Sequence, residues 1–359
     1  MNVTVIGGGN VGTQLAVHCA AAGNNVTVYS SKPQLFGKHL TISNKSGRPL
    51  LSADICRATA DISEAVDNAD MIIVTLPAFC MDDIAAKLLS YIRTGLIILL
   101  VPGTGGSEFA FRECRRKGAV ICGLQRVPSV ARLVEYGKEV CAEGYRDCLY
   151  LAALPKEQTD KLCTIVSTFM SMECKPLPDY LNLTLTPSNP ILHTSRLRTI
   201  FKDYKEGRGY NSLPLFYEEW SDESSELLFE MDNEVQQLCA LLDGFDLSYV
   251  KSLKIHYGCD SPSKLTAKIR SISGFKGLKT PFKVIDGMLY PDLESRYFTA
   301  DFPYGLAVII CIAELYGANI PKLRSVMEWY RSVCGCSAEF ELSSYGINNK
   351  SDFEHYYDK

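Results

Sequence analysis

Hydrophobic and polar positions follow different patterns in the two halves of the chain. In the first half, short runs of β-branched and apolar residues alternate with helical patterns. The predicted strands are residues 3–6, 26–29, 71–76, 96–101 and 119–123. The predicted helices between them are residues 11–22, 62–68, 82–92 and 107–117. This alternation is typical of a doubly wound, mostly parallel sheet with helices on its faces, so we expect an α/β domain.

The second half carries helical periodicity with few strand signals. Its predicted helices are residues 189–201, 223–242, 263–271, 302–316 and 320–333. Three prolines, Pro176, Pro178 and Pro187, cluster just before these helices, and proline interrupts both helices and strands. We therefore expect an α/β domain over residues 1–182 and an all-α domain over residues 183–359.

Two segments follow neither pattern closely. Residues 127–154 are less regular and predict antiparallel strands at one edge of the sheet, before a further helix at 155–172. The tail after Ser337 is polar, and we expect it to pack poorly.

Composition and charge narrow the class of protein. Of the 359 residues, 47% are hydrophobic and 22% are charged, which is ordinary for globular proteins and excludes a disordered or fibrous chain. The net charge is −4, so no global basic field exists to hold a nucleic-acid backbone. The longest apolar helical stretch, residues 306–316, contains Glu314 and is shorter than the roughly 20 residues of a membrane span. We therefore expect no nucleic-acid partner and no membrane partner.

The fourteen cysteines are scattered along the chain, and several lie in apolar segments. No Cys-x-x-Cys pair occurs, and the closest spacing is Cys334-Gly335-Cys336. Without the spacings of a zinc site or a redox motif, buried and reduced thiols are the better interpretation. The chain runs from Met1-Asn2 directly into a predicted strand, which leaves no room for a secretion signal. We therefore expect a cytoplasmic protein with no metal site.

A glycine-rich motif follows the first predicted strand, in the order Val3-Thr4-Val5-Ile6-Gly7-Gly8-Gly9-Asn10-Val11-Gly12. Gly7 lets the chain turn sharply, Gly9 lets the backbone approach a diphosphate, and Gly12 lets the next helix pack closely on the strand. The helix start at Asn10 and Val11 offers free N–H groups and the positive end of a dipole. A merely tight turn is the plain alternative, but the strand–turn–helix context favours a Rossmann domain that binds a dinucleotide.

The end of the second predicted strand bears on the choice of dinucleotide. NAD sites usually carry Asp or Glu there for the ribose 2′-hydroxyl, whereas this chain has Ser30-Ser31-Lys32. Two hydroxyls and a cation suit a 2′-phosphate, although the serines could instead bond their own backbone. NADP is therefore favoured over NAD. Pro77 and Gly103 follow two further strands and are expected to line the cofactor crevice.

An oxidoreductase also needs a group that moves a proton, and His193 is the strongest candidate among the five histidines. Asn189 and Pro190 predict a helix start, with His193 about one turn inside it. We expect this turn to lie at the seam between the two domains. On these residues alone, a structural histidine is as good an interpretation as a catalytic one.

A second cluster carries polar side chains in an apolar setting. It runs Arg296-Tyr297-Phe298-Thr299-Ala300-Asp301-Phe302-Pro303-Tyr304-Gly305. In one interpretation Asp301 caps the following helix and Arg296 is solvated. In the other, Arg296 binds a substrate carboxylate and Asp301 orients a histidine.

Taken together, three motifs resemble the octopine/nopaline (opine) dehydrogenase family. They are the N-terminal glycine motif, Asn-Pro-x-x-His at residues 189–193, and Arg-Tyr-Phe-Thr-x-Asp-x-Pro-Tyr-Gly at residues 296–305. The resemblance covers about residues 1–335, and it implies a Rossmann domain and a helical domain with substrates bound between them. It also implies an NAD(P)H-dependent reductive condensation of an amino acid's amine with a 2-oxo acid such as pyruvate, giving a secondary-amine dicarboxylate.

The resemblance also implies roles for individual residues. His193 matches the catalytic histidine, Asp301 its paired acid, and Arg296 the arginine that binds a substrate carboxylate. These residue types suit the chemistry, because water must leave a carbinolamine before an imine can be reduced, and an acid/base near neutral pH serves that step.

A further segment, residues 124–132, resembles the family's Gln…Pro-Tyr…Arg pattern. This likeness implies that Gln125 and Arg132 bind substrate, although Ser129 stands where the family commonly has an aromatic residue. The expected partners are an amino acid and a 2-oxo acid, and the expected state is a monomer or a homodimer.

Two other functions fit the same architecture. A 2-oxo acid or ketopantoate-type reductase would need no amine. A dinucleotide-binding sensor would keep the fold without turnover, but it would have no need for an acid/base beside the nicotinamide.

Overall fold

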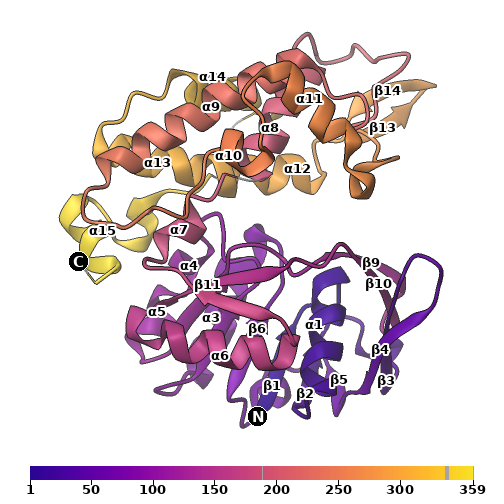
Figure 1. Ribbon diagram of the computed structural model, residues 1–359, viewed down its shortest axis with the longest axis vertical. Helices are drawn as coiled ribbons and strands as arrows, with labels where there is room; N and C mark the ends of the chain where they lie inside the picture. The colour runs from indigo at the N-terminus through magenta and orange to yellow at the C-terminus, as the bar shows by residue number, and fades with distance from the viewer. Residues whose placement is uncertain (188, 336–338, 359) are drawn as a thin grey trace. The chain divides into compact units, whose positions relative to one another are not determined.

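The computed structural model describes residues 1–187, 189–335 and 339–358 (Figure 1). Ser337, where the polar tail is predicted to begin, and Cys336 of the closest cysteine pair lie outside the described residues. The described chain divides into two units, Met1–Thr184 and Leu185–Lys359.

Unit 1 is built on an eight-stranded sheet. Its strands are β1 (Asn2–Ile6), β2 (Asn25–Tyr29), β5 (Arg57–Thr59), β6 (Met71–Val74), β7 (Ile97–Leu100), β8 (Val120–Leu124), β11 (Cys148–Leu154) and β12 (Glu173–Pro176). They lie in the order β12-β11-β8-β7-β6-β1-β2-β5. The pairing of β11 with β8 is antiparallel and the other pairings of this sheet are parallel, so β11 and β12 run opposite to the other six strands. The predicted doubly wound, mostly parallel sheet is confirmed. The order of the strands reverses at β1, which lies between β2 and β6.

Helices cover both faces of this sheet. They are α1 (Asn10–Ala21), α2 (Ile62–Val66), α3 (Met81–Leu88), α4 (Ser107–Ala110), α5 (Arg112–Arg116), α6 (Thr159–Met170) and α7 (Leu181–Thr184), with short 3₁₀ turns at Pro33–Leu35, Ala78–Cys80, Leu89–Tyr91 and Lys156–Gln158. One face of the sheet packs on α1 and α6 in a continuous core. Every residue of β6 and β7 is buried, as expected for central strands covered on both sides.

A second, four-stranded sheet contacts α1. It has the order β4-β3-β10-β9, from β3 (His39–Ser43), β4 (Pro49–Asp54), β9 (Val130–Glu135) and β10 (Glu139–Glu143). The prediction of antiparallel strands for residues 127–154 at the sheet edge is right for β11, which pairs antiparallel with β8. Strands β9 and β10 are antiparallel to each other, as predicted, but they lie in the second sheet and not at the edge of the first. The sequence pattern missed β3 and β4 because β4 alternates between exposed and half-buried positions and carries no apolar run.

Unit 2 is helical. Its helices are α8 (Asn189–Ile200), α9 (Asp222–Leu241), α10 (Leu253–Tyr257), α11 (Pro262–Ser271), α12 (Arg296–Thr299), α13 (Ala307–Tyr316), α14 (Pro321–Cys334) and α15 (Lys350–Tyr356), with a π-helical turn, η6 (Asp301–Leu306), and 3₁₀ turns at Ser273–Phe275 and Leu342–Tyr345. One hairpin, β13 (Phe282–Ile285) with β14 (Met288–Pro291), departs from the predicted all-α composition.

The C-terminal tail packs against unit 2, contrary to the prediction of poor packing. Helix α15 buries Phe353 completely, and the Phe353 and Tyr357 rings both contact Phe245. The aromatic residues of this otherwise polar tail supply the apolar surface that holds it in place.

Helix α12, the π turn η6 and α13 form one continuous helical segment, Arg296–Tyr316, of 21 residues. It is longer than the apolar stretch predicted from the sequence, and by length and composition alone it could cross a membrane. However, 61% of its most apolar window is buried inside the fold, as in the core helix of a globular domain.

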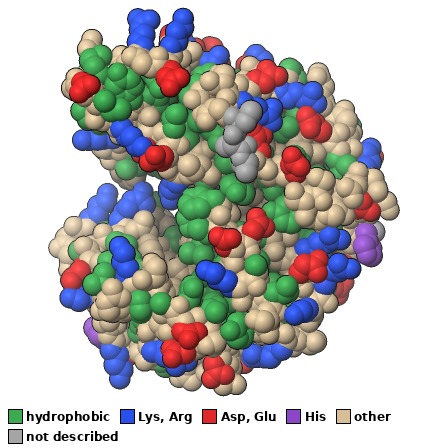
Figure 2. Space-filling view, turned by 180° about the vertical axis from the view of Figure 1, so that it is seen from behind, with side chains coloured by type: hydrophobic (Ala, Val, Ile, Leu, Met, Phe, Trp, Pro, Cys, Tyr) green, Lys and Arg blue, Asp and Glu red, His purple; other side chains and the backbone are tan. Residues whose placement is uncertain are grey.

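Charged side chains of both signs are interspersed over the face that Figure 2 presents. Exposed ion pairs among the described residues include Lys202 with Glu223 and Lys322 with Glu230. Exposed pairs of this kind contribute roughly 0–1 kcal/mol to stability, so the fold depends on its core rather than on its surface charge.

Helix α9 carries two acidic residues that bind the starts of neighbouring helices. Glu234 accepts hydrogen bonds from the N–H groups of Lys322 and Leu323 in the first turn of α14. Asp232 accepts one from the N–H of Leu253 at the start of α10. Burial raises the pKa of Asp232 to about 6, because the apolar surroundings penalise its charged form.

Asp232→Asn is expected to stabilise the protein at pH 8 and to leave its stability unchanged near pH 4. The folded-state pKa lies above the ordinary value, so the favourable contribution of the neutral carboxyl is complete below about pH 4 and is lost as the pH rises through about 6. The neutral amide removes this loss, for a gain of at most about 3 kcal/mol. Thermal unfolding at the two pH values measures the difference, with the exposed Asp243→Asn as control. An equal change at both pH values would contradict a raised pKa at Asp232.

Candidate active site

The glycine motif forms a tight turn between β1 and α1. Gly7 has φ +113°, a conformation that side chains rarely adopt. A Cβ on Gly12 would lie 1.8 Å from the Gly7 carbonyl oxygen, so only glycine lets α1 pack this closely on β1. A Cβ on Gly9 would meet nothing within 4 Å, which leaves open space over the turn.

The start of α1 fits a diphosphate. Gly9 is its N-cap and gives no side-chain hydrogen bond to the first N–H groups of the helix. The Asn10 side chain is engaged elsewhere, because its oxygen accepts from the N–H of Leu133 on β9. Asn10 and Val11 can therefore offer main-chain N–H groups. The turn lies where the strand order reverses between β1 and β6, the usual place for a ligand in a doubly wound sheet.

Residues 30–32 follow β2, as predicted, but they are not equally available. Ser30 is buried, and its hydroxyl bonds the Tyr136 hydroxyl at 2.7 Å and accepts from the N–H of Lys32. Ser31 and Lys32 are exposed. A ribose 2′-phosphate at this place would therefore meet Ser31 and Lys32, while Ser30 holds the turn together with Tyr136.

The two residues predicted to line the crevice differ in their surroundings. Pro77 is exposed just after β6. Gly103 is buried, and its Cβ would lie 2.7 Å from the Cα of Gly123 on β8, so its lack of a side chain serves close packing. Of the two, only Pro77 presents surface to solvent.

Gln125 and Arg132 lie on different sheets of unit 1. Gln125 follows β8, and its N–H donates to the Tyr150 carbonyl of β11. Arg132 is exposed on β9 and donates to the carbonyl of Ala131. Ser129, at the position where the family commonly has an aromatic residue, is buried and accepts a 2.8 Å hydrogen bond from Gln14 of α1.

His193 is buried in unit 2 with a partner on each ring nitrogen. Nδ1 lies 2.7 Å from a carboxylate oxygen of Asp301, and Nε2 lies 2.7 Å from the Tyr217 hydroxyl. A carboxylate only accepts, so Nδ1–H donates to Asp301, and in the neutral imidazole Nε2 accepts from Tyr217. The rings of Tyr297 and Phe216 lie edge-on, with centroids 4.6 and 5.7 Å from the imidazole. Aromatic side chains therefore form a box around a largely buried histidine–carboxylate pair.

Asp301 reaches His193 because of the π turn η6. The carboxylate does not cap a following helix, as one interpretation of the sequence had it, because the helical segment already begins at Arg296. Close packing supports the contact: a Cβ on Gly305 would lie 2.9 Å from the Pro190 ring at the start of α8. π turns often occur at functional sites, since the extra residue turns a side chain out of the regular helical register.

Two residues near His193 were not predicted from the sequence. Tyr217 is one, and Arg196 is the other. The Arg196 guanidinium donates to the carbonyls of Phe216 and Glu219, at 2.9 and 2.7 Å, and so fixes the segment that carries Tyr217. The aromatic run Phe216-Tyr217-Glu218-Glu219-Trp220 is the only sequence signal that points to this place.

Arg296 is exposed at the start of α12, five residues before Asp301. Its guanidinium carbon lies 6.0 Å from the centroid of the Tyr297 ring, the same ring that packs against His193. The Tyr297 ring thus lies between the exposed Arg296 guanidinium and the buried His193 imidazole.

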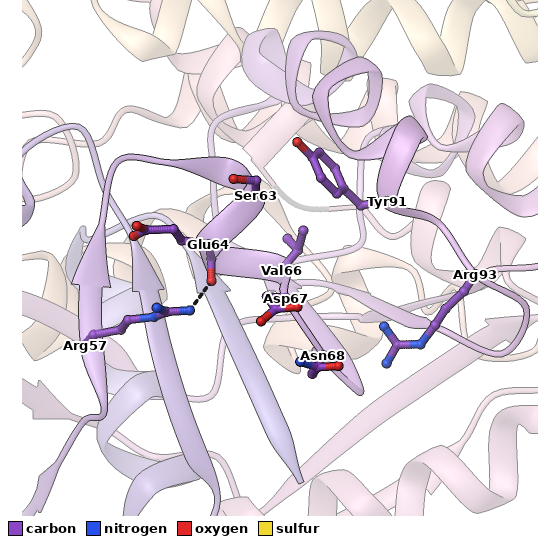
Figure 3. Close-up of a pocket in the computed structure, with 8 residues that line it drawn as sticks. All are labelled: Arg57, Ser63, Glu64, Val66, Asp67, Asn68, Tyr91 and Arg93. Atoms are coloured by element: carbon purple, nitrogen blue, oxygen red, sulfur yellow. Dashed lines mark hydrogen bonds between the residues drawn. The ribbon is translucent and has the colours of Figure 1, made fainter.

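A separate open cavity of about 580 Å³ lies in unit 1 (Figure 3). It is lined by residues that precede β5, β6 and β7 or begin them, so it opens at the amino ends of the strands, away from the glycine turn. Its two arginines already donate to the main chain, Arg57 to the Glu64 carbonyl and Arg93 to the Ala69 carbonyl. This cavity therefore has no part in the candidate site.

Known proteins resemble this chain in sequence and in fold. The sequence matches the families "NAD/NADP octopine/nopaline dehydrogenase, alpha-helical domain" over residues 176–334 and "NAD-dependent glycerol-3-phosphate dehydrogenase N-terminus" over residues 2–104. Tauropine dehydrogenase of Arabella iricolor is 26% identical over 365 residues, covering 93% of this chain and 91% of that protein. Octopine dehydrogenase of Mizuhopecten yessoensis is 26% identical over 77% of this chain and 73% of that protein. A solved structure of octopine dehydrogenase with NADH and L-arginine has the same fold, with a TM-score of 0.85 at 22% identity over 100% of this chain and 98% of that one.

A Rossmann unit joined to a helical unit with a buried histidine–carboxylate pair defines an NAD(P)-dependent oxidoreductase. Residues 176–334 match the octopine/nopaline dehydrogenase family, and the chain is similar over most of its length to tauropine and octopine dehydrogenases. The predicted fold class, enzyme class and resemblance to opine dehydrogenases are confirmed. The curated relatives favour opine dehydrogenase over the reductase and the sensor.

Gly305→Ala is expected to lower kcat by about tenfold to a hundredfold, because the new methyl group meets the rigid Pro190 ring and pushes Asp301 away from His193. The affinity for NAD(P)H should stay the same, since the change lies in unit 2. Steady-state kinetics and a cofactor titration measure the two effects. The control is Gly244→Ala, where a Cβ meets nothing within 4 Å. If both variants retain the wild-type kcat, the close approach of η6 to α8 does not position Asp301.

Proposed function

We propose that this opine dehydrogenase condenses the amine of an amino acid with a 2-oxo acid such as pyruvate. The product is a secondary-amine dicarboxylate, and the reverse oxidation uses the same residues. The observation that carries the proposal is the buried hydrogen bond of 2.7 Å between His193 and Asp301. A simple binding module has no use for a buried acid/base pair of this kind.

His193 acts as the general acid and base. The amine first adds to the carbonyl carbon of the 2-oxo acid and gives a carbinolamine. His193 then supplies the proton that lets the carbinolamine hydroxyl leave as water, and an iminium ion remains. Asp301 holds the imidazole in the Nδ1–H tautomer and stabilises its charged form. In the oxidative direction, His193 takes the proton back.

The cofactor is NAD(P)H, with NADP the favoured form. When bound, it supplies the hydride that reduces the carbon–nitrogen double bond. Its diphosphate would be held by the main chain of Gly7, Gly9, Asn10, Val11 and Gly12. Ser31 and Lys32 would hold the 2′-phosphate. The absence of a carboxylate at residues 30–32, where it would repel a phosphate, supports this assignment.

The two substrates each carry a carboxylate, and arginine binds carboxylates through two parallel hydrogen bonds. We assign this role to Arg296, which is exposed close to the His193 box. Gln125 and Arg132 are further candidates by resemblance. Because every described cysteine is a free thiol, we also place the enzyme in a reducing, cytoplasmic compartment.

Oxidation of NADPH, followed by its absorbance, is expected to require both pyruvate and a pool of amino acids. NADPH is expected to give the higher kcat/KM when the assay is repeated with NADH. His193→Asn, which keeps a polar side chain of similar reach, should lower turnover by about a hundredfold or more and leave cofactor binding unchanged.

Oxidation with pyruvate alone would contradict the proposed reaction, because it needs no amine and identifies a 2-oxo acid reductase. Full activity of the His193→Asn variant would remove His193 from the chemical step.

Arg296→Ala is expected to raise the KM for pyruvate by about tenfold to a hundredfold, through loss of a charge-assisted, two-pronged contact. Arg296→Lys should restore only part of this affinity, because an ammonium group keeps the charge but not the planar fork. Initial rates against pyruvate concentration give the answer. A KM within twofold of wild type in the alanine variant would assign the carboxylate to another residue.

A further inference from the structure

Both ring nitrogens of His193 are already in use. An imidazole nitrogen exchanges a proton only in the ring plane, along its single lone pair or N–H direction. Asp301 occupies this direction at Nδ1 and the Tyr217 hydroxyl occupies it at Nε2, each at 2.7 Å. His193 itself is 3% exposed. A proton that leaves Nε2 in this arrangement can pass only to the oxygen of Tyr217.

The position of Tyr217 is fixed from several sides. Its ring stacks on Phe275, with centroids 4.1 Å apart and planes 16° from parallel, and on Trp220. The main chain on both sides of it is held by Arg196, which donates to the carbonyls of Phe216 and Glu219.

Arg196 itself is 2% exposed and makes a cation–π contact with the Trp220 ring at 5.4 Å. Burial lowers its pKa to about 10, so it stays charged at neutral pH. One helix, α8, therefore carries both His193 and, one turn later, the residue that holds the segment of Tyr217. Such a costly buried cation fits a segment that must not move relative to His193.

We propose that Tyr217 is a further catalytic residue, whose hydroxyl relays the proton between Nε2 of His193 and the reacting oxygen of the substrate. This inference rests on the proposed function and names the path of its proton.

The step balances without any other reactant. The Nε2–H proton of the imidazolium moves to the Tyr217 oxygen, while the Tyr217 hydroxyl proton moves to the carbinolamine hydroxyl. The carbon–oxygen bond breaks, water leaves, and the lone pair of nitrogen forms the carbon–nitrogen double bond. His193 ends neutral, and Tyr217 ends as a phenol again.

The chemistry of Tyr217 suits a relay. Burial, together with the neighbouring Tyr297 and Asp301, raises its pKa well above 10, so the hydroxyl keeps its proton at neutral pH. A phenol that accepts one proton while it donates another never has to become a phenolate. The raised pKa is therefore compatible with the concerted transfer and would oppose a stepwise one.

The Tyr217→Phe variant distinguishes the relay from an alternative in which the Tyr217 hydroxyl only covers Nε2 and moves away before the reaction. The relay predicts a fall in the single-turnover rate of about a hundredfold or more, with NADPH affinity within twofold of wild type. If the hydroxyl only covers Nε2, the single-turnover rate of the variant should be unchanged or higher, because Nε2 is then free. The phenylalanine ring retains the stacking on Phe275. The matched control is Tyr316→Phe, which removes a hydroxyl bonded to Glu354 in the same unit and should leave the rate unchanged.

A second measurement uses the wild-type enzyme alone, with NADPH, pyruvate and the amino-acid pool. The single-turnover rate is measured in mixtures of H₂O and D₂O. Two protons that move in one step give a curved dependence on the deuterium fraction, and a linear dependence would overturn the relay.

The outcomes for the relay and for the enzyme's function are distinct. Amine-dependent NADPH oxidation by the wild type with an equally active Tyr217→Phe variant overturns the relay and leaves the proposed function intact. Absence of amine-dependent oxidation in the wild type overturns the proposed function and the relay with it.

Discussion

The hydrogen bond between His193 and Asp301 is the contact on which the proposed chemistry depends. It joins two segments that are 108 residues apart in the sequence, and it does so in a box of aromatic rings where an unpaired charge would be costly. The carboxylate fixes the proton on Nδ1, so Nε2, which is bonded to the Tyr217 hydroxyl, is the nitrogen that exchanges a proton. Gly305 makes the contact possible, because it lets the π turn approach Pro190 of α8.

In unit 1 the constraint is different, because the main chain of the glycine turn must come close to the diphosphate of the cofactor. Gly7 and Gly12 are required by the turn and by the packing of α1 on β1, while Gly9 leaves space open above them. The same unit shows how a plausible ligand residue can be engaged elsewhere. Ser30 stands where the ribose would lie, yet its hydroxyl is bonded to Tyr136, which comes from the second sheet.

The sequence predicted the elements and motifs that are formed by residues close together in the chain. It missed the contacts that only tertiary packing creates. The parallel sheet and the long helices follow from periodicity, and the glycine turn and the His193 and Asp301 motifs are contiguous in the chain. Tyr217 carries no motif, and it meets His193 only because Arg196 folds its segment back on α8. Strand β4 was missed because its residues are exposed or half-buried. The predicted helix began at residue 302, whereas the π turn extends the helical segment back to Arg296.

The most direct test of the account follows the hydride of the cofactor into the product. The enzyme is incubated with pyruvate, the amino-acid pool and NADPH that carries deuterium at the transferred position of the nicotinamide, and the products are weighed by mass spectrometry. The account predicts a secondary-amine dicarboxylate with one deuterium for the wild type, and almost none of it for His193→Asn. Deuterated lactate in place of that product, or equal amounts of the dicarboxylate from both proteins, would contradict the central role of the His193–Asp301 pair.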